Sequence, residues 1–164
     1  MTTPPPSGAG PVSPLTAVAL ATVTFVALII GAFGVLALVL GEDPIETPGI
    51  GQVPGIVATA LSAIVFGASL WFTLRRRHPQ SRPSFWSAAG VALAAAIAYV
   101  AMLWIAAVAT GADLGAAGGA AGRIATSWFG VALLLAAFAC AWGGIALVRT
   151  RAERPRWPWE DDED

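Results

Sequence analysis

The chain is divided into long apolar stretches separated by short clusters of charged residues. A helix rises about 1.5 Å per residue and the hydrocarbon core of a bilayer is about 30 Å thick, so about 20 apolar residues cross it. Four stretches without any charged residue meet this length: Leu15–Leu40, Val53–Leu74, Phe85–Ala109 and Ile124–Val148. The pattern predicts an all-α membrane protein, with four transmembrane helices in an antiparallel up-down bundle over residues 15–148.

Composition argues against a water-soluble fold. Apolar residues make up 57% of the chain and charged residues 12%, and the mean hydropathy is +0.73. Four helices that are apolar all round, in a chain of 164 residues, would leave no polar faces for water. The net charge of −1 gives no support for nucleic-acid binding, and a single cysteine, Cys140, excludes an internal disulfide.

The first apolar stretch differs from a secretory signal peptide. Such a peptide has a basic leader and about 7–15 apolar residues. Here residues 1–14 contain no Lys or Arg and are rich in Pro, Gly, Ser and Thr, and the apolar stretch that follows is longer. We therefore expect a retained span that is preceded by a disordered tail over residues 1–14.

The arginines predict the orientation, because basic residues near span ends stay cytoplasmic. Apart from Arg123, every arginine lies between the second and third spans or after the fourth. These topology-determining residues are Arg75, Arg76, Arg77, Arg82, Arg149, Arg151, Arg154 and Arg156. Four spans put both groups on the same side. Both termini are thus predicted to be cytoplasmic in a plasma-membrane protein, with Glu42, Asp43, Glu46 and Asp113 outside.

The segments outside the spans leave two alternatives open. Residues 110–122 are nearly all Gly and Ala, and form either a flexible loop or a helical extension. Residues 149–164 form a tail with arginines first, then Trp157 and Trp159, then acidic residues. This tail is either a solvated terminus whose arginines enforce topology, or a docking segment for a basic cytoplasmic partner.

Small residues recur at four-residue spacing in three of the spans. Because lipid is as apolar as leucine, helices in a bilayer associate through close packing of small side chains. The candidate helix-packing residues are Gly55, Thr59, Ala63 and Gly67 in the second span, Ala88, Ala92 and Ala96 in the third, and Ala136 and Gly144 in the fourth. The stripes propose contact faces, either within the monomer or between molecules.

Candidate chemistry is sparse. No ionisable acid or base lies in any span, which disfavours a proton-coupled transporter. The single histidine, His78, lies in a turn beside arginines, so no pair of histidines can hold a haem. Cys140 lies in apolar surroundings, and the span serines have no base to activate them. We expect no catalytic residue, cofactor or metal.

One polar residue inside the spans is a candidate for a specific role. Tyr99, near the middle of the third span, must find a partner for its hydroxyl or line a polar cavity.

Nine arginines without a lysine, high Ala, Gly and Val content, a Pro-rich leader and an Arg/Trp/acidic tail resemble small uncharacterised four-span integral membrane proteins of actinobacteria. The resemblance covers the whole layout but includes no specific motif, and it implies no site residues. We therefore expect a non-enzymatic accessory or scaffold protein that binds another membrane protein or itself. The alternative is an oligomeric channel or facilitator for a small or apolar solute, lined by Thr, Ser and Tyr99.

Overall fold

The computed structural model describes residues 13–43, 51–76 and 85–149, and these residues form five helices. Four of them are long and apolar enough to cross a membrane, and the fifth is a shorter helix of 13 residues. The helices are α1 (Pro14–Leu40), α2 (Val53–Arg76), α3 (Phe85–Ala109), α4 (Leu114–Thr126) and α5 (Trp128–Arg149). The prediction of an all-α transmembrane bundle is confirmed. The predicted tails over residues 1–14 and 149–164 lie outside the described residues, except that Ser13 and Pro14 begin α1 and Arg149 ends α5.

The ends of α1 follow directly from its sequence. The Ser13 hydroxyl accepts a hydrogen bond from the Thr16 backbone N–H at 3.1 Å, and Pro14 occupies the first turn, where no N–H is needed. Gly41 ends the helix at φ 66°, a left-handed conformation that glycine adopts without steric cost, and its N–H donates to the Ala37 carbonyl. The span is therefore bounded by local signals as well as by hydropathy.

The fourth span begins at Trp128 in the structure, whereas hydropathy places its start at Ile124. The Gly/Ala segment forms α4, so its helical alternative is the observed one. Asp113 starts this helix by accepting hydrogen bonds from the N–H groups of Gly115 and Ala116. The chain leaves helical geometry at Ser127, with φ −99° and ψ 175°. Hydropathy could not locate this bend, because residues 124–127 contain no charged residue that would separate them from the span.

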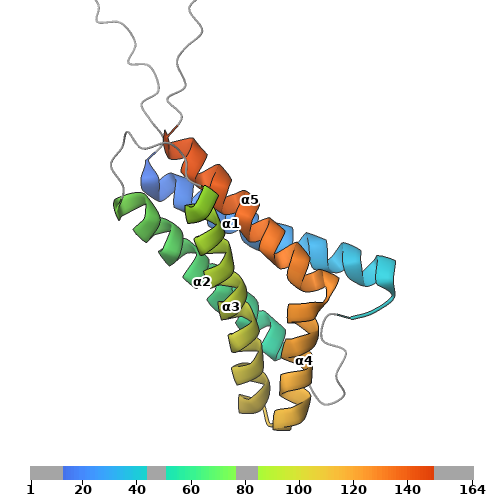
Figure 1. Cartoon of the computed structure of the whole chain (residues 1–164). Helices are drawn as coiled ribbons and strands as arrows, with labels where there is room; N and C mark the ends of the chain where they lie inside the picture. The colour runs from blue at the N-terminus through green and yellow to red at the C-terminus, as the bar shows by residue number, and fades with distance from the viewer. Residues whose placement is uncertain (1–12, 44–50, 77–84, 150–164) are drawn as a thin grey trace, which may run out of the picture.

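The four long helices form a ring in which each is antiparallel to its neighbours. α1 packs against α2 and α5, and α3 packs against α2, α4 and α5, so α1 and α3 lie diagonally across the ring. Figure 1 shows the start of α1, the end of α2, the start of α3 and the end of α5 together at the top left. We call this the arginine end, and we call the opposite end, which contains Asp43 and Asp113, the acidic end.

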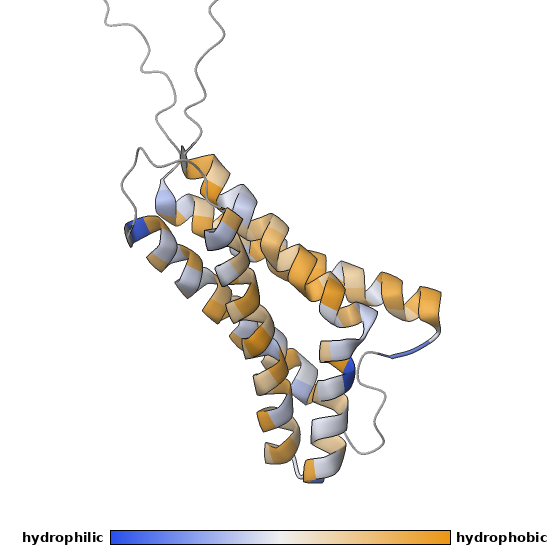
Figure 2. Ribbon diagram, viewed as in Figure 1, coloured by the Kyte–Doolittle hydropathy of each residue, from blue (hydrophilic) through white to orange (hydrophobic). Residues whose placement is uncertain are grey.

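The interior combines aromatic rings with small residues. Phe25 of α1 stacks on Phe66 of α2 with ring centroids 4.5 Å apart. Between α2 and α3, the Ser62 hydroxyl donates to the Ala95 carbonyl at 2.9 Å. Apolar residues also cover the outside of the long helices (Figure 2), as expected for surfaces that face lipid.

The helices do not stay together along their whole length. Near the arginine end, α1 and α2 are in close contact, because a methyl group added at Gly67 would lie 3.1 Å from the Thr22 hydroxyl oxygen. Toward the acidic end, α1 leans away from α2 and α3 together with α5 (Figure 1). α4 fills the space between α3 and α5 there. The divergence of α1 from α2 opens the cleft described next.

Candidate functional site

A cleft of about 780 Å³ lies between α1 and α2 in the half of the bundle nearest the acidic end. This volume is within the range of about 300–1,000 Å³ that is usual for small-molecule sites. The cleft is lined by Val26, Ile29, Ile30 and Phe33 of α1, Asp43, Gly51 and Gln52 of the segments beside the helices, Gly55, Ile56, Thr59 and Ala60 of α2, and Tyr99 of α3. The inner wall is thus mostly aliphatic and aromatic.

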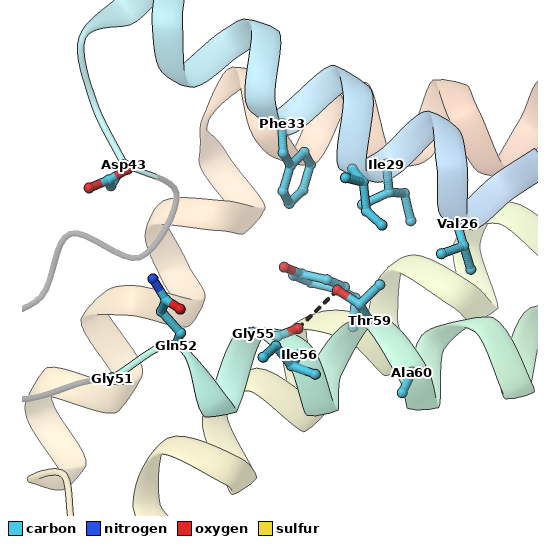
Figure 3. A pocket seen from close by; sticks show the side chains of 12 residues that line it. Val26, Ile29, Phe33, Asp43, Gly51, Gln52, Gly55, Ile56, Thr59 and Ala60 are labelled. Atoms are coloured by element: carbon cyan, nitrogen blue, oxygen red, sulfur yellow. Dashed lines mark hydrogen bonds between the residues drawn. The ribbon is translucent and has the colours of Figure 1, made fainter.

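The α1 wall is held in place by aromatic contacts to the rest of the bundle. Val26, Ile29 and Phe33 project from α1 toward α2 (Figure 3). The ring of Phe33 meets Tyr99 edge-on at 5.9 Å and Phe129 of α5 edge-on at 5.3 Å. Edge-to-face pairs of this kind are a preferred aromatic geometry. Phe33 therefore links the cleft to both α3 and α5.

Two hydroxyl groups supply the polarity inside the cleft. The Thr59 hydroxyl donates to the Gly55 carbonyl at 2.9 Å (Figure 3), which leaves its lone pairs available as acceptors. Tyr99 of α3 lines the same cleft as Thr59, and its side chain is only 2% exposed. Tyr99 thus lies on a cavity wall, one of the two alternatives that its sequence position left open.

The mouth of the cleft is polar. The side chains of Asp43 and Gln52 lie at the acidic end of the cleft, beside the ends of α1 and α2 (Figure 3), and both residues are exposed. A carboxylate accepts hydrogen bonds and attracts cations. The cleft therefore runs from an anionic mouth to an apolar interior with one pair of hydroxyls.

The small-residue stripe predicted on α2 is divided between two surroundings. Gly55 and Thr59 line the cleft, whereas Ala63 is buried and Gly67 faces Thr22 of α1. The stripes of the other spans lie inside the bundle. Ala88, Ala92 and Ala136 are buried, Ala96 packs against the core, and a methyl group at Gly144 would lie 3.2 Å from the Ala21 side chain.

The predicted topology residues lie at the arginine end where the structure describes them. The Arg75 guanidinium lies over the Trp71 ring at 4.3 Å, and Arg76 and Arg149 are the last residues of α2 and α5. Arg77, Arg82, Arg151, Arg154 and Arg156 lie outside the described residues, as does His78. Within the described part of the chain, no group of three or more His, Cys, Asp or Glu residues could hold a metal ion.

Sequence reasoning missed two surfaces. It placed Asp43 only among the acidic residues outside the membrane and assigned no role to Gln52, because nothing in the sequence indicates that α1 diverges from α2. It also proposed no contact face on the first span. Yet Ala27 and Gly31 have the same four-residue spacing as the other stripes, and with Thr24 and Gly34 they form an exposed row on α1. The spacing rule could have found this row.

Comparison with known proteins gives a family without an assigned function. No curated protein and no solved structure matches the chain. One family profile covers nearly all of it, from the start of α1 through residue 164. The chain belongs to a family of unknown function (DUF6121), which matches residues 14–164.

Proposed function

We propose that this multi-pass membrane protein is a non-enzymatic accessory or scaffold protein that binds another membrane protein through α1. The observation that carries the proposal is the row of Thr24, Ala27, Gly31 and Gly34, which we call the α1 small-residue face. All four residues are exposed in the monomer. Methyl groups added at Gly31 and Gly34 would meet no atom within 4 Å. The protein's own helices therefore leave this face uncovered.

Helix geometry puts these residues on one side of α1. Residues three and four positions apart lie on the same face of a helix, and the steps from Thr24 to Gly34 are three, four and three residues. The buried residues of α1 form a different row: Ala17, Ala21, Phe25, Ile29 and Phe33. The small-residue face thus points away from the bundle that the chain itself forms.

Energetics favour a partner on this face. Each glycine in a helix interior costs about 1 kcal/mol relative to alanine, and lipid gives nothing in return for a missing side chain. A second helix can offset this cost, because small residues let two helix backbones approach closely. α1 also has the smallest buried share of the four spans, 17% of its most apolar window against 44% for α3.

The proposal places the arginine end in the cytoplasm and the protein in the plasma membrane, following the bias of arginines toward cytoplasmic loops. In this orientation residues 149–164 are available to a cytoplasmic partner. The absence of any ionisable acid or base from the sequence of the spans supports a binding role over an enzymatic one, since intramembrane chemistry usually needs such a group.

Photo-crosslinking from α1 tests the proposed binding role. A photoreactive amino acid at Ala27 should give a discrete adduct with a foreign membrane protein in cells, while the same group at the exposed Leu93 of α3 should give only lipid and diffuse products. Gly31→Leu should abolish the Ala27 adduct, and the matched change Gly90→Leu, at another exposed helical glycine with open space around it, should leave it intact. Equal adducts from Ala27 and Leu93 would contradict the proposal. An adduct of twice the chain mass would identify the partner as a second copy.

A second candidate is an oligomeric facilitator for a small or apolar solute. It is favoured by the position of Tyr99 and Thr59 on the wall of an open cleft. Near the middle of the span the same two helices are closed by the stacked rings of Phe25 and Phe66. Solute flux into liposomes that contain the purified protein distinguishes the two roles, because a scaffold gives no flux above that of empty liposomes.

A further inference from the structure

We propose that the cleft between α1 and α2 binds one membrane lipid from the leaflet at the acidic end, with a head group that carries an ammonium ion at Asp43. This site lies on a different side of α1 from the small-residue face, and it goes beyond the scaffold role. It is carried by three observations: the length of the cleft, its lateral opening and its gradient of polarity.

The length of the cleft fits one leaflet. The lining residues of α1 run from Val26 to Phe33 and those of α2 from Gly55 to Ala60, while Gly51 and Gln52 lie just before α2. At about 1.5 Å per residue the two helical segments are about 9–12 Å long, which is less than half of the roughly 30 Å hydrocarbon core. A partner helix crossing the bilayer would need a groove along the whole span. The cleft does not extend that far, because α1 and α2 are in contact at Thr22 and Gly67.

The cleft opens sideways to the bilayer. Ile30 of α1 and Ile56 of α2 line it, and they are 64% and 65% exposed in the monomer. These residues lie within helices that cross the membrane, so the opening faces acyl chains rather than water. A groove of this volume between two apolar walls loses dispersion contacts unless an apolar chain fills it. An acyl chain reaches it by lateral diffusion.

The polarity gradient determines which lipid fits. Asp43 follows the end of α1 and Gln52 precedes α2, so both lie where the span ends and head groups begin. An ionised carboxylate attracts a cation, and an amide oxygen accepts a hydrogen bond from an ammonium group. An anionic head group would instead be repelled by Asp43. The mouth therefore favours a lipid with a primary ammonium over an anionic lipid with the same chains.

Lipid competition with the purified full-length protein tests this proposal. The protein is mixed in mild detergent with equal amounts of phosphatidylethanolamine and phosphatidylglycerol of identical chains, and bound lipid is counted by native mass spectrometry. We expect one bound lipid, with phosphatidylethanolamine retained about two- to fivefold over phosphatidylglycerol, the affinity ratio of an exposed ion pair. Asp43→Asn should remove this preference, and Glu42→Gln, at the neighbouring exposed carboxylate that does not line the cleft, should keep it.

A second pair of variants tests the apolar part of the site. Ala60→Trp places a large ring in the cleft and should eliminate the retained lipid, whereas Ile64→Trp, one turn further along α2 on an exposed position outside the cleft, should not. Lipid retention by Ala60→Trp equal to that of the unmodified protein would overturn the site. If Ala60→Trp does not fold, the Asp43→Asn result decides alone. Equal retention of both lipids by the unmodified protein, or a polypeptide bound in the cleft instead of a lipid, would also overturn the proposal.

Discussion

At the scale of single residues, hydroxyl groups do little to join the helices, and small residues do more. Most described hydroxyls bond within their own helix, as Thr22 does to Val18 and Thr73 does to Ser69. Ser62 is different, because its hydroxyl reaches the Ala95 carbonyl across the gap between α2 and α3. Double-mutant cycles put such interhelical bonds at about 0.6 kcal/mol on average. Close approach at glycine has larger consequences when it is blocked.

Gly144 gives the sharpest test of this close approach. A methyl group there would lie 3.1 Å from Cδ2 of Leu70 and 3.2 Å from the Ala21 side chain, whereas one at Gly143 would meet nothing within 4 Å. Gly144→Val should therefore lower the free energy of unfolding in detergent by about 1–3 kcal/mol, the usual cost of overpacking. Gly143→Val is the matched control, since it has the same helix propensity in the same turn. Equal stability of the two variants would show that α5 can move away from α1 without loss.

At the scale of elements, hydropathy predicts the spans well and fails where composition is ambiguous. The first and third spans begin and end within one residue of the predicted bounds, because Ser13, Gly41 and the charged clusters mark their limits. The sequence leaves α4 open between a loop and a helix, because glycine destabilises a helix and alanine stabilises it. Its helical state depends on packing: Ala117 and Ala120 lie against Ala107 of α3.

The cap at Asp113 should be decisive for α4, since four glycines weaken this helix from within. Loss of a helix N-cap costs about 0.5–2 kcal/mol. Asp113→Ala should raise hydrogen–deuterium exchange across residues 114–126, leaving exchange in α5 unchanged, as measured by mass spectrometry in detergent. Asp113→Asn keeps a capping oxygen and should stay close to the unmodified protein. Unchanged exchange in Asp113→Ala would mean that contact with α3 alone holds α4.

At the scale of the whole molecule, the sequence predicts an up-down bundle but not its shape. Which helices touch at which depth depends on contacts between residues far apart in the chain, such as Thr22 with Gly67 and Phe33 with Phe129. A four-residue stripe on α2 is the same pattern whether α1 covers it, as at Gly67, or leaves it open, as at Thr59. The cleft could therefore not be found from spacing alone. The positions of the two ends of the bundle, in contrast, can be predicted from the clusters of charged residues.

The orientation of those ends is the remaining prediction. Single cysteines at Thr47 and Gln80, in a Cys140→Ala background, lie between spans one and two and between spans two and three, respectively. Because arginines near span ends stay cytoplasmic, a membrane-impermeant maleimide should label the thiol at position 47 in intact cells. It should label the thiol at position 80 only after permeabilisation. Labelling of both in permeabilised cells is the control for accessibility. Labelling at position 80 in intact cells would show that the bundle has the opposite orientation. The mouth of the cleft, with Asp43, would then lie in the cytoplasmic leaflet.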